Sequence, residues 1–236
     1  FEIAKAFAES GASVINCTTN GTLVNRVLSF AERVLTELRL AKFVIVISID
    51  APEKLHNELR GIPAWKSAIA CFKRLRELKN EFRNFSCFIG YTISPFNLGK
   101  LLDTFVAIRK IVPDFRLSEL HVNLMHVSAS YYRNLGLRVP KDFYERALEE
   151  IEWFAEHRSF NLLSPIGILE KLYLARVRDF VFKKRCPFPC KALRSSVFID
   201  AFGNVYPCVQ WEEKLGNLRS VDFRLARILR SEKARR

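Results

Sequence analysis

Three cysteines near the end of the chain are the residues best suited, by type and spacing, to do chemistry. They fall within twenty-three residues: Cys186, Cys190 and Cys208. Residues 197–199 and 205–206 have the pattern of two short strands, and the Gly-containing segment 200–204 is typical of the turn between them. Such a hairpin folds the chain back, so that Cys208 approaches the other two thiols. Three converging thiolates indicate a soft-metal or iron–sulfur site.

The remaining cysteines lie singly in apolar surroundings: Cys17, Cys71 and Cys87. Isolated cysteines in such segments are typically buried and inert, so we expect these three thiols to be structural. Disulfides are not expected, because nothing in the sequence indicates secretion and a chain of 236 residues does not need such cross-links.

Composition allows one large domain, or one large domain with a small appendage, since 49% of the 236 residues are hydrophobic. No signal-peptide pattern precedes the first predicted helix, and the longest apolar run, residues 43–47, is too short to cross a bilayer. We therefore expect a cytoplasmic protein with no membrane partner. Because the sequence begins with Phe1, we also expect the natural protein to start further upstream.

The net charge of +13 is concentrated near the C-terminus. Residues 181–236 contain thirteen Lys or Arg against five Asp or Glu, a net charge of +8. Such a region can bind nucleic acid or an acidic substrate. The terminal run has no interleaved aromatic residues for base stacking, which favours a solvated basic helix and tail over a nucleic-acid partner.

The first 130 residues alternate between strand and helix patterns. The predicted strands are 12–17, 43–49, 85–93 and 120–127, and the predicted helices between them are 24–40, 63–82 and 98–111. This rhythm predicts βα units and an α/β fold with a parallel sheet, and it leaves open a doubly wound sheet or a barrel. In both, functional groups gather where strands end and loops begin.

The rhythm changes after residue 138. Residues 141–157 and 164–182 have helical patterns, and the cysteine segment and a last basic helix follow. We place a boundary near residues 159–164. It divides a βα body (1–160) from a small metal-bearing extension (161–236).

Three loop motifs follow the predicted strands, and each has an ordinary structural interpretation. Residues 19–22, Thr-Asn-Gly-Thr, are typical of a turn. Residues 48–50, Ser-Ile-Asp, end a buried strand, and Asp50 is suited to cap a helix beginning near Glu53. His56 and Arg60 precede Gly61, which is a helix stop signal, and most such residues lie in a surface loop.

Taken together, these motifs resemble the radical S-adenosylmethionine (radical SAM) enzyme family. The resemblance rests on three motifs in order along the chain: Thr-Asn-Gly after one strand, Ser-Ile-Asp at the end of the next, and then His-(x)₃-Arg-Gly. A second match lies in the cysteine segment. The spacing there is Cys-(x)₁₂-Gly-(x)₄-Cys, from Cys190 through Gly203 to Cys208. It resembles the opening of the SPASM/twitch extensions, which bind auxiliary iron–sulfur clusters. The resemblance implies the last four units of a (βα)₆ TIM-like barrel, followed by a SPASM/twitch-type hairpin and helix extension.

The resemblance also implies roles for particular residues. It places three of them beside bound S-adenosylmethionine: Thr19, Asn20 and Gly21. Ser48 would hydrogen-bond this cofactor, and Arg60 would pair with its methionine carboxylate, because a guanidinium can form two parallel hydrogen bonds to a carboxylate. Asp50 would organise the loop, and Asn97 would serve the cofactor end of a later strand.

The same resemblance implies that Cys186, Cys190 and Cys208 hold an auxiliary [4Fe–4S] cluster. In the intact protein, reductive cleavage of S-adenosylmethionine would give a 5′-deoxyadenosyl radical that abstracts hydrogen from a small-molecule or peptide substrate. Ferredoxin or flavodoxin would be the electron donor. The sequence lacks the family's Cys-(x)₃-Cys-(x)₂-Cys loop, so no catalytic residue is assigned, and the isolated chain is expected to be inactive. A fragment of a longer enzyme is the simplest explanation, and a degenerate relative without the catalytic cluster is the alternative.

Two other classes of protein stay open at this point. A zinc-binding interaction module also uses clustered cysteines, although zinc sites favour Cys-(x)₂-Cys pairs and four ligands. A basic RNA-binding protein would account for the charge of the C-terminal region. Iron content separates the first alternative from the cluster hypothesis.

Overall fold

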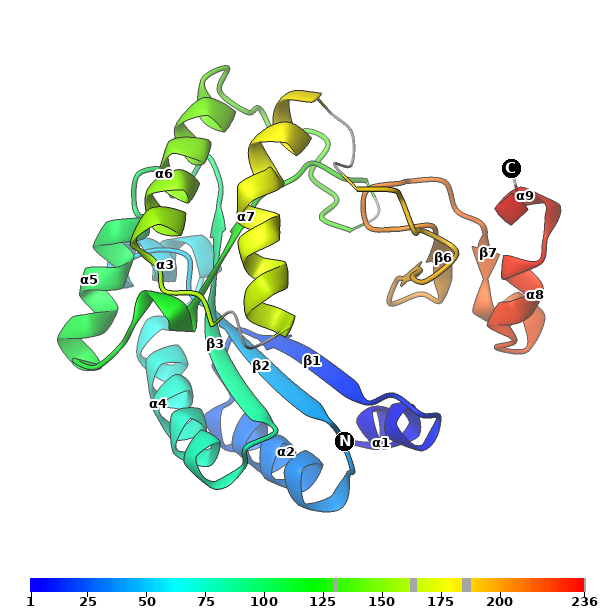
Figure 1. The fold of residues 1–236 in the computed structure, drawn as a ribbon, viewed down its shortest axis with the longest axis horizontal. Coiled ribbons are helices and arrows are strands. Elements are labelled where there is room, and N and C mark those ends of the chain that lie inside the picture. The colour runs from blue at the N-terminus through cyan, green and yellow to red at the C-terminus, as the bar shows by residue number, and fades with distance from the viewer. Residues whose placement is uncertain (130, 162–164, 184–187, 236) are drawn as a thin grey trace. The chain divides into compact units, whose positions relative to one another are not determined.

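The computed structural model describes residues 1–129, 131–161, 165–183 and 188–235, and these form two compact units. The first unit comprises Phe1–Met125 and Pro140–Ala175, and the second comprises His126–Val139 and Arg176–Arg236. Figure 1 shows the course of the chain through both. The predicted division between residues 160 and 161 concerns functional domains, and it stays a prediction.

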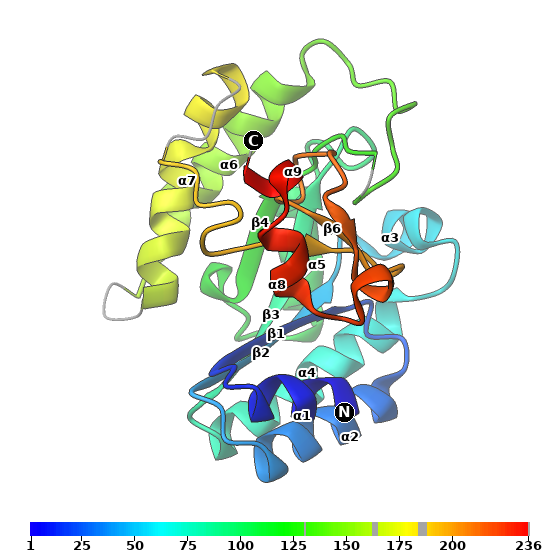
Figure 2. The ribbon, with the colours of Figure 1, turned by 90° about the vertical axis from the view of Figure 1, so that its right-hand side faces the viewer.

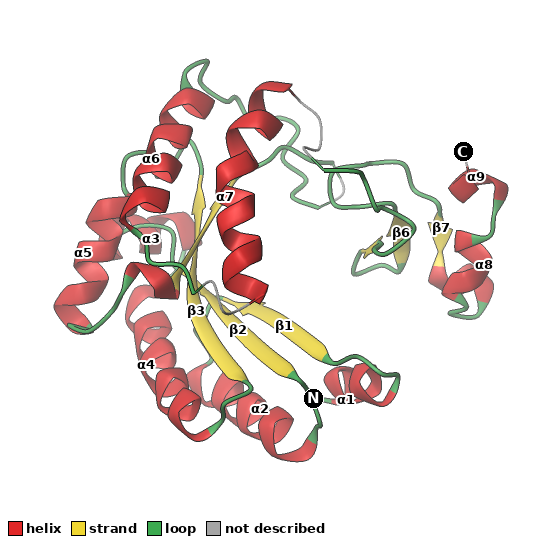
Figure 3. Cartoon of the chain, in the orientation of Figure 1, coloured by secondary structure: helices red, strands yellow, loops and turns green. Residues whose placement is uncertain are grey.

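The first unit is built on a four-stranded parallel sheet with the order β1-β2-β3-β4 (Figure 3). Its strands are β1 (Val14–Thr19), β2 (Lys42–Ser48), β3 (Phe85–Ile93) and β4 (Leu120–Leu124). The predicted α/β class and parallel sheet are therefore confirmed. Within the described residues the sheet is open, with β1 and β4 at its edges.

Helices follow the strands as the sequence pattern predicts. In the first unit they are α1 (Glu2–Glu9), α2 (Val24–Glu37), α3 (Glu53–Arg60), α4 (Trp65–Glu81), α5 (Leu101–Ile111), a 3-10 turn (Leu117–Glu119), α6 (Phe143–His157) and the first part of α7 (Pro165–Lys183). None of the described helices is long and apolar enough to cross a membrane.

The two faces of the sheet differ in burial. Along β3, Phe85, Cys87, Ile89 and Tyr91 are buried, whereas the residues between them are only half-buried. Because side chains alternate along a strand, the first set shares one face, which α4 covers. The second face is more polar and exposed, and it includes Ser48 at the end of β2.

A buried ion pair holds α7 against β4. The Arg158 side chain donates from Nη2 to Oε2 of Glu170 at 2.6 Å and from Nη1 to the Leu120 carbonyl at 2.7 Å. Nδ1 of His121 lies 2.7 Å from Oε1 of the same glutamate. Removing one partner from such a buried pair leaves an uncompensated charge, so these contacts are expected to anchor Glu170 of α7 to β4.

The second unit contains a small antiparallel sheet with the order β5-β6-β7 (Figure 2). Its elements are β5 (Phe198–Ile199), β6 (Asn204–Tyr206), β7 (Gly216–Asn217), a 3-10 turn (Leu218–Val221), α8 (Leu225–Leu229) and α9 (Glu232–Arg235). The predicted hairpin is confirmed as β5–β6. The prediction of one basic terminal helix is wrong, because Ile228 of α8 packs against Val205 and Leu215 and the chain turns before α9 begins.

Gly21 provides a test of how closely the first loop approaches α4. Its φ is +69°, and an added Cβ would lie 3.0 Å from both the Ala68 Cα and the Ile47 Cγ2. Gly61 has nearly the same φ, +68°, but open space around it. We expect Gly61→Ala to cost about 1 kcal/mol through backbone strain alone. Gly21→Ala should cost about 1–3 kcal/mol more, because it adds overpacking.

Urea unfolding of both variants and the wild type measures this difference. Equal destabilisation by the two substitutions would contradict the close approach of the loop to α4.

Candidate functional site

The candidate site lies where the parallel strands end. The register pairs Thr19 with Ile47, Ser48 with Gly90, and Ile93 with Leu124, so the carboxyl ends of all four strands meet at one edge of the sheet. The structure therefore brings the predicted Thr-Asn-Gly segment and Ser48 to the ends of neighbouring strands. Ligand sites of open α/β sheets occur at such an edge.

The loop after β1 holds its own shape by local hydrogen bonds. The Gly21 N–H donates to Oγ1 of Thr19 at 3.2 Å. The backbone N–H and the hydroxyl of Thr22 both donate to Oδ1 of Asn20, at 3.1 and 2.8 Å. Asn20 thus forms an Asx turn, which agrees with the ordinary interpretation of this motif.

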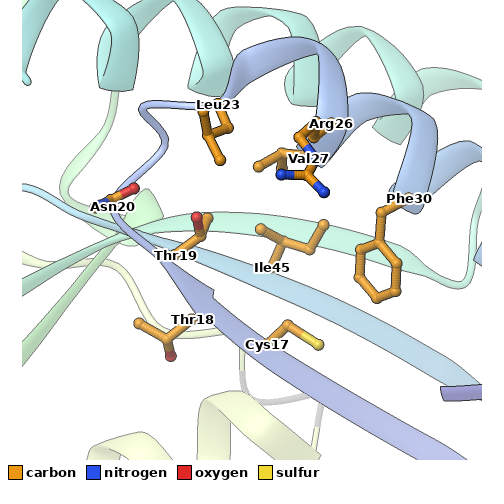
Figure 4. A pocket seen from close by; sticks show the side chains of 9 residues that line it. All are labelled: Cys17, Thr18, Thr19, Asn20, Leu23, Arg26, Val27, Phe30 and Ile45. Atoms are coloured by element: carbon orange, nitrogen blue, oxygen red, sulfur yellow. The ribbon is translucent and has the colours of Figure 1, made fainter. Parts of the chain in front are cut away.

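A shallow groove of about 290 Å³ lies between β1 and α2 (Figure 4). It is lined by Cys17, Thr18, Thr19, Asn20, Leu23, Arg26, Val27, Phe30 and Ile45. The Cys17 thiol is half-buried here, so the expectation that it is a fully buried thiol is wrong. Burial still raises its pKa. Two of the predicted cofactor residues, Thr19 and Asn20, line the groove.

Asp50 joins three segments at the edge of the sheet. Its Oδ1 accepts the Thr92 N–H at 3.3 Å, its backbone N–H donates to Nδ1 of His56 at 3.2 Å, and its other carboxylate oxygen pairs with Arg60. Burial raises the pKa of this carboxyl, and the Arg60 guanidinium opposes the rise. The prediction of a loop organiser is confirmed. The prediction of a helix cap is wrong, because Pro52 occupies the N-cap of α3.

Arg60 ends α3, and the glycine stop signal after it is confirmed by the left-handed conformation of Gly61. The Arg60 Nη2 donates to the Asp50 carboxylate, which orients the guanidinium. Its Nε is buried with no hydrogen-bond partner among the described residues. This orphaned donor fits a further acceptor, and the predicted pairing with a methionine carboxylate stays a prediction.

Two residues of the site have a role that the sequence did not reveal. His56, expected in a surface loop, is fully buried on α3, where its ring contacts Trp65 edge-on. Asn97 is also buried, and its amide is fully used: Nδ2 donates to the carbonyls of Asp50 and Thr92, and Oδ1 accepts from Ser94. The structure thus gives Asn97 a structural role at the end of β3, and the expectation that it serves the cofactor stays a prediction.

The C-terminal cysteines lie in the second unit. Cys190 is an exposed free thiol, Cys208 is a half-buried one just after β6, and Cys186 lies outside the described residues. In the described part of the chain, no group of three His, Cys, Asp or Glu side chains is placed to hold a metal ion. By contrast Cys71 and Cys87 are buried as expected, and burial raises their pKa values to about 11 and 12.

These features define a class of protein: an α/β unit with a polar strand-end edge, joined to a small β unit that carries accessible thiols. Residues 190–236 match the family model of SPASM, an iron–sulfur cluster-binding domain. The matched segment contains Cys190 and Cys208 and begins after Cys186. It assigns iron–sulfur binding, a role associated with radical SAM enzymes, to this part of the chain. No curated protein and no solved structure matches the chain.

The burial of His56 predicts a pH-dependent stability. Burial, together with the nearby Arg60 charge, lowers the pKa of His56 from 6.5 to about 4. As the pH falls, His56 in the unfolded chain therefore takes up a proton near pH 6.5. In the folded chain the same side chain stays neutral until about pH 4. This contribution to stability is complete above pH 6.5 and falls by about 2–3 kcal/mol on acidification to pH 4.5.

Urea unfolding of the wild type and His56→Gln at pH 7.5 and pH 4.5 tests this, since glutamine keeps an acceptor for the Asp50 N–H. The wild type should lose about 2–3 kcal/mol more than the variant over this interval. Parallel losses in the two proteins would show that His56 does not resist protonation.

Proposed function

We propose that this chain is part of a radical SAM enzyme, and that Cys186, Cys190 and Cys208 hold an auxiliary [4Fe–4S] cluster. The observation that carries the proposal is the SPASM match over residues 190–236, which includes two of the three cysteines. The donors fit the group: Cys190 and Cys208 are free thiols and neither is fully buried. Thiolates are the usual ligands of iron–sulfur clusters.

The hairpin between these cysteines is fixed by side-chain hydrogen bonds. Asp200 accepts the Asn204 N–H at 2.9 Å and its Nδ2 at 2.8 Å, and Asn217 Nδ2 donates to Oδ1 of Asn204 at 2.8 Å. These bonds tie all three strands of the small sheet together. Cys208 follows β6 by two residues, so the network sets the point from which this ligand would reach a cluster.

We further propose that the parallel sheet represents the last four strands of a (βα)₆ TIM-like barrel, with residues 1–160 as the incomplete core and 161–236 as the SPASM/twitch-type extension. In this account Thr19, Asn20, Gly21 and Ser48 lie beside S-adenosylmethionine. When bound beside a catalytic cluster, this cofactor would supply radical chemistry for abstracting hydrogen from the substrate. Arg60, oriented by Asp50, would donate hydrogen bonds to the cofactor carboxylate.

The proposed substrate is a small molecule or a peptide, and the proposed electron donor is ferredoxin or flavodoxin. We propose that the protein works in the cytoplasm.

Thiol alkylation tests the assignment of the cluster ligands. In the metal-free chain, iodoacetamide should label the exposed Cys190 and, more slowly, Cys208. After anaerobic reconstitution with iron and sulfide, both should be protected, because a thiolate bound to iron is no longer a free nucleophile. Mass spectrometry of the digested protein gives the labelled fraction at each position.

The half-buried Cys17 is the internal control, and its labelling should not change on reconstitution. Unchanged labelling of Cys190 and Cys208 would exclude them as ligands. Protection by zinc but not by iron would instead support a zinc-binding module.

Arg60→Lys tests the proposed cofactor contact. Lysine keeps the charge but cannot form the two parallel hydrogen bonds of a guanidinium, so S-adenosylmethionine should bind about tenfold more weakly. Equilibrium dialysis with radiolabelled cofactor gives the dissociation constants. Arg39→Lys, on the surface of the same unit, is the matched control and should bind like the wild type. If Arg60→Lys and Arg39→Lys bind S-adenosylmethionine with the same affinity, Arg60 does not pair with the methionine carboxylate of the cofactor.

A further inference from the structure

Almost all of the excess positive charge belongs to the second unit. That unit contains seventeen Lys or Arg against six Asp or Glu, a net charge of +11, whereas the first unit has twenty-one against nineteen, a net charge of +2. Residues 126–139, which precede α6 in the sequence, add two arginines and two tyrosines to this unit. The basic character is therefore a property of the folded unit as well as of the C-terminal run.

Two exposed phenylalanines of this unit lie next to guanidinium groups. Phe202, at the tip of the β5–β6 hairpin, is 58% exposed, and Cζ of Arg133 lies 5.2 Å from its ring centroid. Phe223, between the last 3-10 turn and α8, is 66% exposed, and Cζ of Arg219 lies 5.9 Å from its ring centroid. Each pair presents a flat apolar ring to solvent beside a fixed positive charge.

Backbone hydrogen bonds bring together the segments that carry the two pairs, and we call the four residues the ring–arginine surface (Arg133, Phe202, Arg219 and Phe223). The Leu218 N–H donates to the Gly203 carbonyl at 2.8 Å, so the turn that carries Arg219 lies against the hairpin tip. The Phe223 N–H donates to the Leu218 carbonyl, also at 2.8 Å. Figure 2 shows β6 and α8 of the unit to which these residues belong.

Two members of the surface have an unfavourable backbone conformation. The φ of Arg133 is +53° and that of Phe223 is +58°, in the left-handed region that non-glycine residues seldom adopt. Each costs on the order of 1 kcal/mol or more, which packing elsewhere must offset. Strained residues whose side chains face solvent are characteristic of binding sites, because burial of the side chain does not explain the strain.

The acidic side chains near this surface are engaged within the unit. The Asp200 carboxylate accepts hydrogen bonds from the hairpin tip and from Asn204, and Asp222 lies 3.8 Å from Arg227. These two carboxylates keep their charge, so the positive field of the unit rests on its net charge of +11.

We propose that the ring–arginine surface binds a single-stranded nucleic acid, with bases stacked on Phe202 and Phe223 and phosphates paired with Arg133 and Arg219. Alternating rings and cations match a strand in which every nucleotide has one flat base and one negative charge. An acidic peptide matches the charge but offers no regular stacking partner. The sequence-based expectation against nucleic acid considered only the C-terminal run, whereas these rings come from the hairpin and the loop before α8. The proposal does not depend on a cluster or on S-adenosylmethionine.

Fluorescence anisotropy with labelled U₁₂ RNA and T₁₂ DNA tests the proposal on the full chain. The double variant Phe202→Ala/Phe223→Ala should bind about 30-fold more weakly or worse, because two stacked bases are lost. Arg133→Gln/Arg219→Gln should flatten the slope of log K against log salt by about 1.4, since each lost phosphate contact contributes about 0.7. The relative affinities for the two oligonucleotides then show whether the surface prefers single-stranded RNA or single-stranded DNA.

The matched control is Phe7→Ala/Arg39→Gln in the first unit, where Phe7 is 60% exposed, and it should bind like the wild type. Circular dichroism melting confirms that each variant is folded. The proposal is overturned if neither oligonucleotide binds or if the ring and control variants bind equally. It is also overturned if a poly-glutamate peptide competes as well as unlabelled oligonucleotide at equal charge.

Discussion

The parallel pairing of four strands is the constraint on which the first unit depends. Because β1 to β4 run in the same direction and in register, every strand must end at the same edge of the sheet. Residues far apart in the sequence therefore meet in hydrogen bonds: Asp50 bonds to Thr92, 42 positions away, and to Asn97, 47 positions away. The loop after β1, the Asp50 loop and the Asn97 loop share this edge only because the sheet places them there.

Polar groups buried at that edge make it rigid. Asp50 would be costly to bury alone, and burial does raise its pKa, but Arg60 and the Thr92 N–H compensate its charge. Asn97 uses both its donor and its acceptor atoms to join this loop to the next. The Nε of Arg60 and the Nε2 of His56 are buried without a hydrogen-bond partner in the described part of the chain, and both belong to α3.

The regular elements could be predicted from periodicity, and much of the site could not. The continuous apolar run of β2 and the alternation of buried and half-buried positions in β3 both follow from how these strands are buried. Both strands can therefore be recognised in the sequence. His56 lies in a short helix with mostly polar residues, and its burial against Trp65 of α4 comes from tertiary packing. The two-residue strand β7 has no period to detect, and the Arg133–Phe202 contact joins residues far apart in sequence.

The second unit combines two accessible cysteines with a SPASM match, and iron–sulfur binding is the central claim for it. The most direct measurement is Mössbauer spectroscopy of the chain after anaerobic reconstitution with ⁵⁷Fe and sulfide, with metal content measured on the same sample. Our account predicts about four irons per chain in the spectrum of a [4Fe–4S] cluster. Stoichiometric zinc with no bound iron, after reconstitution with both metals present, would contradict it.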